Sequence, residues 1–538
     1  MRNTFTILNS LLAILYSIAP VSARQGDGRT IEVLLIGGRV MDGAGNHWVR
    51  ADVGISSDRI VFVGSATGSR IQARDTVDVT DMLVTPGFWD MHSHAEFETQ
   101  HGRHALPFIY QGITTVVLGV DGGGGNTIDE IFDGYSTAGI AVNALRYVGH
   151  GAARRAVMGV ADREPSPGEL DALKAYVRSG MEEGAIGLST GLFYIPGYFA
   201  KTDEVVALNA VAAEYGGVYD THDRDLGAAY QGIGYDASVA EAIEIGERTG
   251  TPVIFSHFNP QGAHNYGRAN VGAQLIDEAR SRGVNVMAAQ HVYTATQSSL
   301  RAYAIPRWAA DGGRDAMLSR FQDPSTIRRL DAETMEMLAL RGGPEKILFA
   351  DQRQELNGRT LAEVASGWEL PVPESVRRII TERNASVMNL DLYDIENTRY
   401  LAQMEWMMTC TDGRTPPPGG GIVHPRPYGA FTRKLRLFVR EEGLISLPFA
   451  VRGMTSLGAT FLGIPERGLI KEGFYADIAV FDEPRIADRA TFENPHQYSE
   501  GTVHVMVNGE FAFRDGEPTG VLGGRPIRRD GRGSEARD

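Results

Sequence analysis

The chain contains the stretch Thr85-Pro86-Gly87-Phe88-Trp89-Asp90-Met91-His92-Ser93-His94, a short hydrophobic run that ends in His-x-His. Side chains alternate between the two faces of a β-strand, so His92 and His94 are predicted to share one face. Two imidazoles at a strand end can supply half of a metal site. The alternative is that one histidine caps the strand and the other is a polar loop residue. The rest of the chain has to decide between these two interpretations.

Beyond this stretch, apolar strand-like runs alternate with helical segments such as 168–183 and 237–249. With the His-x-His strand included, eight strands are predicted, and such alternation is typical of an α/β fold of the (β/α)8 TIM-barrel type. The other seven predicted strands are 112–119, 142–149, 185–189, 217–220, 252–256, 284–289 and 406–409.

Short alternating strands before residue 85 and again after about residue 476 indicate β structure at both ends of the chain. We predict that residues 24–84 and 466–522 form one small β-sandwich beside a barrel of residues 85–465. The interval before the last barrel strand is far longer than a normal connection, so residues 295–400 are predicted to form a helical lid. The charged, glycine-rich segment 523–538 is predicted to be disordered.

Residues 1–23 have the pattern of a secretory signal peptide, with Arg2, an apolar run at 11–15 and small residues at 21–23. This pattern predicts an exported protein, periplasmic or extracellular. The apolar run is too short to span a bilayer. Cys410 is the only cysteine, so neither a lipid-modified N-terminus nor an internal disulfide is expected.

The formal net charge of the chain is −15, and no basic run of the kind that binds nucleic acid is present. We therefore expect a small-molecule substrate as the partner, with no nucleic acid and no membrane anchor. The sequence is compatible with an oligomer but does not decide the oligomeric state.

Metal-ligating residue types recur at the C-terminal ends of the predicted strands, where barrel enzymes carry their catalytic groups. Six such residues fall at five strand ends, a pattern that scattered structural histidines explain singly but not as a set. The six residues are His92, His94, Asp121, His222, His257 and Asp412. The sequence therefore predicts a metal centre at this end of the barrel.

With these residues in place, the chain resembles the amidohydrolase superfamily and, within it, the N-acyl-D-amino-acid deacylase (D-aminoacylase) family. The resemblance runs from about residue 31 to residue 529, and its most specific motifs are 85–94, 111–117, 184–192, 221–225, 411–413 and 424–429. It implies a metal-dependent barrel with a β-sandwich built from both termini, and hydrolysis of an N-acyl bond. It also implies that His222 and His257 bind a tighter zinc ion, with His92, His94 and Asp412 around a second, weaker position.

One departure from the family is Asp121, which stands 27 positions after His94 where the deacylases carry a cysteine. Aspartate is an acceptable zinc ligand, and its two oxygens can bridge two ions. The hypothesis is that this exchange favours Mn²⁺ or Co²⁺ beside Zn²⁺ and a fuller second position. Alternatively, Asp121 is a turn residue in a glycine-rich loop and the metal site is degenerate.

A second departure is Asn259, where the family carries a lysine that helps to hold the substrate carboxylate. An amide cannot supply that charge, whereas Arg426 keeps a fork suited to a carboxylate. We therefore expect carboxylate recognition to be weaker or rearranged. Further candidates for substrate contact, each with an ordinary structural role as the alternative, are Tyr194, Tyr293, Ser299 and His150.

Amide hydrolysis near neutral pH needs an activated water, a polarised carbonyl and a proton for the leaving amine, and a divalent ion supplies the first two. Asp412 is the candidate for the third role, as base toward the water and then acid toward the nitrogen. The prediction is a metal-dependent amidohydrolase of N-acyl amino acids, with D-aminoacylase-type substrates first. The alternatives are a dipeptidase or another amidase of the same superfamily, and a non-catalytic barrel protein with a degenerate metal site.

Overall fold

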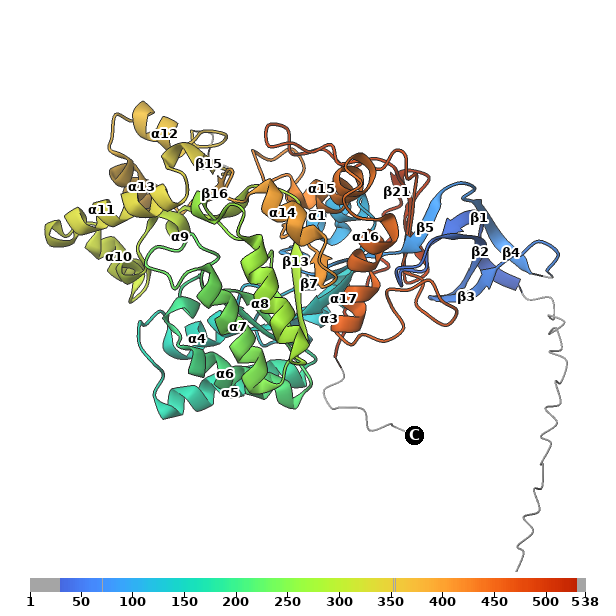
Figure 1. Cartoon of the computed structure of the whole chain (residues 1–538), viewed down its shortest axis with the longest axis horizontal. Coiled ribbons are helices and arrows are strands. Elements are labelled where there is room, and N and C mark those ends of the chain that lie inside the picture. Colours follow the sequence, from blue (N-terminus) through green and yellow to red (C-terminus); the bar gives the residue numbers. More distant parts are fainter. Residues whose placement is uncertain (1–29, 70, 352, 354, 530–538) are drawn as a thin grey trace, which may run out of the picture.

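The computed structural model describes residues 30–69, 71–351, 353 and 355–529 (Figure 1). The predicted signal peptide, residues 1–23, lies outside the described residues. Figure 1 shows β structure at one end of the molecule, parallel strands with their helices in the middle, and the segment of residues 295–400 at the other end.

Both ends of the described chain contribute to one nine-stranded sheet. Strand β5 (Leu83–Pro86) joins the two halves, because it pairs with β1 (Thr30–Val40) on one side and with β18 (Ile478–Phe481) on the other. Buried aliphatic side chains from both halves, such as Val53 and Ile478, form one hydrophobic cluster. The remaining strands of this sheet are β2 (Val49–Ser56), β3 (Arg59–Gly64), β4 (Gln72–Asp78), β19 (Thr502–Val507), β20 (Glu510–Arg514) and β21 (Glu517–Pro518).

Nine short parallel strands occupy the eight positions where barrel strands were predicted, because the third is interrupted at Tyr147. They pair in the order β6–β7–β8 and β9–β10–β11–β12–β13–β17. Their bounds are β6 (Phe88–Asp90), β7 (Ile113–Leu118), β8 (Asn143–Arg146), β9 (Val148–Gly149), β10 (Gly187–Gly191), β11 (Val218–His222), β12 (Val253–Phe255), β13 (Val286–Gln290) and β17 (Met407–Thr409).

The first and last of these strands are adjacent, since the main-chain nitrogen of Met91 donates to the carbonyl oxygen of Thr409 at 3.3 Å. Side chains from successive strands meet in one buried cluster that includes Val117, Val218 and Met408. Such a core inside a ring of parallel strands is consistent with an amidohydrolase TIM-barrel domain. Cys410 belongs to the same cluster and is fully buried, so it is a small core residue.

Helices surround these strands, as the apolar faces in the sequence indicate. Helix α5 begins at a capping box, in which Ser166 and Glu169 each bond the other's main-chain N–H. The principal helices of this layer are α3 (Ile128–Ala138), α4 (His150–Met158), α5 (Pro167–Glu182), α6 (Thr202–Glu214), α7 (Tyr235–Thr249), α8 (Ala269–Ser281), α14 (Ile395–Ala402), α15 (Arg426–Arg433), α16 (Leu447–Met454) and α17 (Ser456–Phe461). Two short helices, α1 (Gln100–His104) and α2 (Leu106–Ile109), follow β6.

The segment predicted as a helical lid also contains a small antiparallel sheet, which the sequence pattern did not indicate. Its strands are too short for a two-residue period to be visible, and they lie far apart along the chain. The segment has its own buried core, with Leu300, Phe349 and Val387 among its members. Its elements are β14 (Thr296–Ser299), α9 (Leu300–Ala304), α10 (Arg314–Arg320), α11 (Pro324–Leu340), β15 (Ile347–Phe349), α12 (Leu361–Gly367), α13 (Val372–Glu382) and β16 (Ser386–Asn389).

The prediction of disorder from residue 523 onward is wrong for residues 523–529. The main-chain nitrogen of Gly524 donates to Ile140, that of Ile527 donates to Ala144, and Ile527 packs against the core between the parallel strands. Composition suggested disorder because the segment is rich in charge and glycine, but its main chain finds partners on β8. Residues 530–538 lie outside the described residues.

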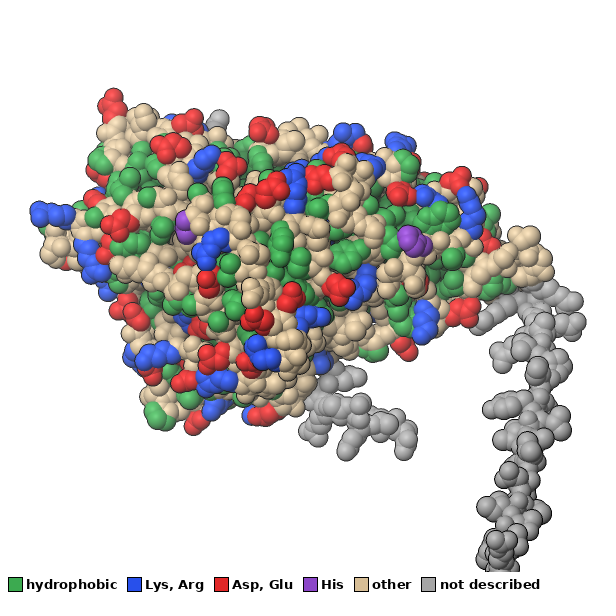
Figure 2. Space-filling view, in the orientation of Figure 1, with side chains coloured by type: hydrophobic (Ala, Val, Ile, Leu, Met, Phe, Trp, Pro, Cys, Tyr) green, Lys and Arg blue, Asp and Glu red, His purple; other side chains and the backbone are tan. Residues whose placement is uncertain are grey.

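The molecular face in Figure 2 carries acidic and basic side chains that are interspersed with apolar ones, without a field of a single sign. Among the residues that the structure describes, no helix is long and apolar enough to cross a membrane.

Candidate metal centre and substrate cavity

Two of the predicted ligand segments are tied together by their main chains. The nitrogen of His94 donates to the carbonyl oxygen of Gly413, and the nitrogen of Asp412 donates to that of His92, both at 2.9 Å. The side chain of Asp90 accepts hydrogen bonds from the nitrogen and hydroxyl of Thr411, at 2.8 and 2.5 Å. The segment after β6 and the segment after β17 therefore form one unit that presents His92, His94 and Asp412 together.

Asp121 reaches this unit from the loop after β7. Its φ of 56° lies in the left-handed region that L side chains rarely adopt, as do those of His257 (25°) and Asp412 (49°). Such conformations persist only where the surrounding fold enforces them, and they cluster at functional sites. Part of the enforcement is steric: a Cβ on Gly191 would lie 2.3 Å from the carbonyl oxygen of Asp121. Glycine at that position therefore allows the loop to pack against β10.

His222 is the last residue of β11, and His257 lies two residues beyond β12. These strands are paired in parallel, so their C-terminal ends meet at one edge. The Nδ1 atom of His222 lies 2.8 Å from Nε2 of His257 and 3.4 Å from Oδ1 of Asp121. Both histidines therefore lie beside Asp121, as their positions at strand ends predict.

All six predicted ligands converge in three overlapping groups of donor atoms. Nε2 of His92 and Nε2 of His94 each lie 3.5 Å from an oxygen of Asp121, and Oδ1 of Asp412 is 3.3 Å from Nε2 of His94. Asp121 belongs to two of the groups. The groups are His92–His94–Asp121, Asp121–His222–His257 and His92–His257–Asp412.

Two observations support the fit of a divalent cation among these residues. Nε2 of His92 and Oδ1 of Asp121 are buried and have no hydrogen-bond partner within the described part of the chain. Leaving such donor and acceptor atoms buried and unpaired is costly, and a cation between them removes the cost. Imidazole nitrogens with carboxylate oxygens are also the donor set expected for Zn²⁺ and for Mn²⁺ or Co²⁺.

The protonation states of His92, His257 and Asp412 suit metal binding, whereas Asp121 outweighs the effect of burial on His222 and raises the pKa of that ring. Burial lowers the pKa of His92 to about 3 and that of His257 to about 4, so both rings are neutral at pH 7. Burial opposes ionisation of Asp412, but the positive charge of Arg426 outweighs it and holds the pKa of this carboxyl well below its usual range. Neutral imidazoles and ionised carboxylates are the forms that ligate metals.

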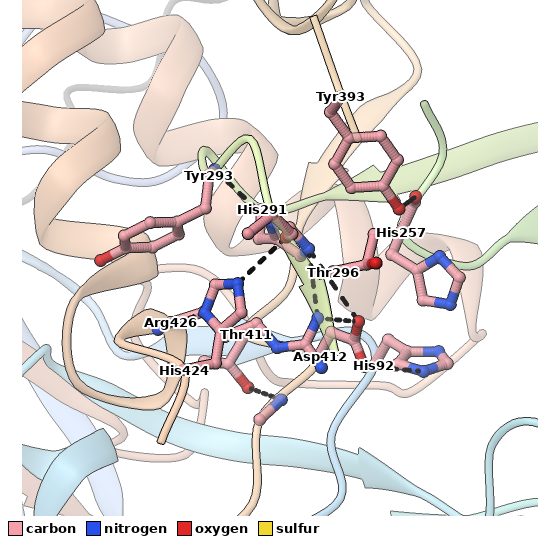
Figure 3. A network of polar contacts seen from close by, with 12 residues as sticks. His92, His257, His291, Tyr293, Thr296, Tyr393, Thr411, Asp412, His424 and Arg426 are labelled. Atoms are coloured by element: carbon pink, nitrogen blue, oxygen red, sulfur yellow. Dashed lines mark hydrogen bonds and ion pairs between the residues drawn. The ribbon is translucent and has the colours of Figure 1, made fainter. Parts of the chain in front are cut away.

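Arg426 lies beside Asp412 and contacts it, as Figure 3 shows. Its Nη1 donates to Oδ2 of Asp412 and approaches Nε2 of His291 at 3.3 Å. The main-chain nitrogen of Arg426 donates to Nδ1 of His424, whose Nε2 is hydrogen-bonded to the carbonyl oxygen of Ala295 at 3.0 Å. The network orients the guanidinium toward Asp412.

A cavity of about 440 Å³ opens above the donor groups. Predicted substrate contacts Tyr194, Ser299 and Arg426 all line it. The ring of Tyr194 packs on that of His222 at 4.6 Å, and its hydroxyl accepts a hydrogen bond from Ser298 at 3.4 Å. Burial raises the pKa of Tyr194 well above its usual value, so the hydroxyl stays protonated and can donate to a ligand.

Two predicted substrate contacts do not line this cavity. His150 is buried at the start of α4, where its Nε2 donates to Glu204 at 2.8 Å beside Arg154. Tyr293 packs between His424 and Arg433. Both residues closely follow a parallel strand, and they were predicted to contact substrate for that reason. Each side chain instead turns into the protein and has a structural role.

Asn259, the position of the second departure, is also absent from the cavity wall. It is buried, and its side-chain nitrogen donates to the hydroxyl of Thr398 at 2.8 Å. His291, which contacts Arg426, and Arg341 were not among the predicted site residues. His291 directly follows β13, so the strand-end rule applied to that strand would have found it, whereas no sequence signal pointed to Arg341, which lines the cavity from the segment of residues 295–400.

The chain is similar to known deacylases along most of its length. A family model described as "Amidohydrolase family" matches residues 75–513. D-aminoacylase of Alcaligenes xylosoxydans xylosoxydans is 31% identical to this chain over 528 residues, which cover 94% of this chain and 99% of the relative.

Solved structures agree with this similarity. A D-aminoacylase structure that concerns a binuclear metal centre has a TM-score of 0.78 and 30% identity, and covers 93% of this chain and 100% of that one. An N-acyl-D-glutamate deacylase from Bordetella bronchiseptica, complexed with zinc and a phosphonate mimic of the tetrahedral intermediate, has a TM-score of 0.77, 28% identity and the same coverage. These relatives support amide hydrolysis with a divalent metal. The chain therefore belongs to the amidohydrolase family.

Proposed function

We propose that this protein is a metal-dependent deacylase that hydrolyses the amide bond of N-acyl amino acids, with D-configured substrates preferred. The observation that carries the proposal is the convergence of six ligand side chains, two groups of which share Asp121, at the base of a 440 Å³ cavity. The names of the relatives support the substrate class, since they are D-aminoacylase and N-acyl-D-glutamate deacylase.

His222, His257 and Asp121 would hold one ion, and His92, His94 and Asp412 would surround a second position that shares Asp121. A bound divalent cation supplies a Lewis acid for the carbonyl and lowers the pKa of a coordinated water. We propose Zn²⁺ as the resident ion, with Mn²⁺ or Co²⁺ accepted, because the carboxylate of Asp121 is a harder ligand than a thiolate.

Asp412 is the proposed general base and acid. Its carboxylate is ionised and lies 3.3 Å from His94 on one side, while Arg426 donates to it on the other. The ionised form accepts a proton from the attacking water. Arg426 then favours return of the carboxyl to its ionised form, so that the proton passes to the leaving nitrogen.

The cavity wall orients the substrate. The protonated hydroxyl of Tyr194 can donate a hydrogen bond beside His222, and Ser299 lines the same wall. The buried side chains around Asp412 exclude bulk water, which strengthens each of these polar interactions.

We further propose that residues 85–465 form a closed (β/α)8 barrel, that residues 295–400 act as its lid, and that residues 24–84 and 466–522 form the accessory β domain. The export prediction from residues 1–23 completes this proposal. Cell fractionation with N-terminal sequencing of the mature protein tests the export prediction, and a cytoplasmic protein with an intact Met1 would contradict that prediction.

The proposed activity is tested with N-acetyl-D- and N-acetyl-L-amino acids against a panel of dipeptides, with and without a chelator. Chelator-sensitive release of acetate from the D-series is the expected result. Hydrolysis of dipeptides alone would instead support a dipeptidase, which the exchange at Asn259 favours. A protein that holds no metal and hydrolyses neither class would support a non-catalytic barrel with a degenerate metal site.

A further inference from the structure

Arg341 follows α11 directly and lies in the wall of the cavity above the metal ligands. The residue is only 3% exposed. Its Nη1 atom is buried and has no hydrogen-bond partner among the residues that the structure describes. A guanidinium carries five N–H donors and a permanent charge, so an unused buried nitrogen is unusual.

The guanidinium is held in place by aromatic rings and one carbonyl group. Its central carbon lies 4.1 Å from the ring centroid of Tyr303 and 5.4 Å from that of Phe193, and Nη2 donates to the carbonyl oxygen of Ala228 at 3.3 Å. Arg341 also borders a second cavity of about 630 Å³, but Tyr303 and Phe193 line only the first. The guanidinium is therefore on the side of the metal centre.

The other arginines of this cavity are engaged or exposed. Arg426 is paired with Asp412, Arg414 is paired with Glu96, and Arg155 is exposed to solvent. Arg341 has no ion pair with any described carboxylate. It is the buried arginine of the described cavity wall that has no carboxylate within ion-pair distance.

The carboxylate of Asp225 is close enough to act electrostatically on Arg341, but it is not within ion-pair distance. Its Oδ1 accepts from the main-chain nitrogens of Gly227 and Ala229, and its Oδ2 accepts from that of Gly234. Asp225 therefore serves the loop that follows β11. Burying an unpaired charge is costly unless a partner arrives, so the site is completed by an anion that enters the cavity.

The distance from the metal ligands suits a small substrate. Phe193 contacts both groups, since its ring centroid lies 5.5 Å from that of His222 and 5.4 Å from the guanidinium carbon of Arg341. One aromatic ring thus separates the cation from a metal ligand. A substrate whose carboxylate lies only a few bonds from its scissile amide can therefore place the carboxylate at Arg341 and the amide at the metal ligands.

We propose that Arg341 is a specificity-determining residue that binds a carboxylate of the substrate, an inference that rests on the proposed deacylase function. Asn259 is neutral and bonded to Thr398, and Arg426 is engaged with Asp412. Arg341 supplies an unpaired positive charge to the cavity from the segment of residues 295–400. The planar fork of arginine suits bidentate binding of a carboxylate.

The test compares each substrate with a neutral partner of the same shape. For the wild-type enzyme, kcat/KM is expected to be higher for N-acetyl-D-alanine than for N-acetyl-D-alaninamide. R341Q is expected to lower kcat/KM for the acid roughly 10- to 100-fold and to change that for the amide less than about threefold. For R341K, kcat/KM for the acid should fall between the values of the wild type and R341Q, because lysine keeps the charge but not the planar fork.

N-acetyl-D-isoglutamine, which carries only a side-chain carboxylate, identifies the carboxylate that is bound. A selective loss with N-acetyl-D-alanine assigns Arg341 to the α-carboxylate, and a selective loss with N-acetyl-D-isoglutamine assigns it to the side chain. R307Q is the matched control, since Arg307 stacks on the same Phe193 ring at 5.0 Å but does not line the cavity. An unchanged preference for acids in R341Q, in protein with the wild-type melting temperature and metal content, overturns the proposal.

A binding measurement separates this inference from the proposed function. N-methylsulfonyl-D-alanine has no acyl carbon to hydrolyse, so its affinity for the metal-loaded enzyme is independent of turnover. Tighter binding of this acid than of its amide, lost in R341Q, supports the role of Arg341 even if no N-acyl amino acid is hydrolysed. Deacylase activity with equal binding of acid and amide leaves the proposed function standing and overturns the role of Arg341.

Discussion

The main-chain nitrogen of Asp412 donates a hydrogen bond to the carbonyl oxygen of His92 at 2.9 Å. This contact joins the segment after the first parallel strand to the segment after the last. Together with the bond from His94 to Gly413, it determines the spacing of three ligand side chains through the main chain. The metal centre is therefore built into the seam between β6 and β17, where a shift of either strand would separate the ligands.

Replacing Asp412 by asparagine tests its role as base and acid. We expect D412N to lower kcat roughly 10²- to 10⁴-fold, because an amide cannot accept the proton of the attacking water. The measurement is kcat together with the metal content of the purified variant. D488N is a suitable control, since Asp488 is also paired with arginine, here Arg433 and Arg436, but lies outside the cavity. Full turnover of a metal-loaded D412N enzyme would remove Asp412 from this role.

Asp121 determines the metal content. D121A is expected to lose metal and activity, because Asp121 belongs to two of the three donor groups. D121C should bind zinc more selectively than the wild type, because a thiolate is a softer ligand than a carboxylate. Metal analysis after reconstitution with Zn²⁺, Mn²⁺ or Co²⁺ measures both effects. A wild-type protein that holds a single zinc ion under all conditions would contradict a two-metal site bridged by Asp121.

The small size of Gly191 is required for the position of Asp121. In G191A the new methyl group meets the carbonyl oxygen of Asp121 and forces the loop to move, so we expect weaker metal binding and lower activity. G134A is the control, since no atom lies within 4 Å of a Cβ at that position. Competition with a chelator gives the metal affinity of both variants. Equal affinities would show that the loop adjusts without moving the carboxylate.

Lys434 makes stability depend on pH. It is buried, donates to the hydroxyl of Thr409 at 2.9 Å, and burial lowers its pKa to about 8 from 10.5. Between these two values the unfolded chain binds more protons than the folded one, so the contribution of Lys434 to stability rises with pH. Below pH 8 the buried charge destabilises the fold in full.

K434M should therefore be more stable than the wild type at pH 7, by about 1–2 kcal/mol after the loss of the bond to Thr409, and the difference should shrink toward pH 10. Urea unfolding at pH 7, 8.5 and 9.5 measures this. K471M is the control, because Lys471 is exposed. A constant difference between K434M and the wild type at all three pH values would contradict a titrating Lys434.

The convergence of the candidate ligands could be predicted from the sequence, because strand ends are visible in short-range patterns. His92, His94, His222 and His257 follow apolar runs that are long enough to be read as buried strands, and parallel strands bring their C-terminal ends to one edge. The same argument was wrong for His150, which starts a helix and turns toward Glu204. The direction of a side chain beyond the end of a strand depends on the loop, which the pattern does not describe.

The sequence by itself determined the family, the parallel strands and the six candidate metal ligands, because these depend on local periodicity and on residue type. Only the tertiary structure decided which side chains complete the cavity. Arg341 lies far along the chain from every candidate metal ligand, in a segment without a sequence signal. Its stacking on Tyr303 and Phe193 directs it inward. The pairing of Arg426 with Asp412, and the hydrogen bond that takes up Asn259, are likewise products of packing. Contacts between residues that are distant in sequence are set by the packing of the whole chain, and no local pattern encodes them.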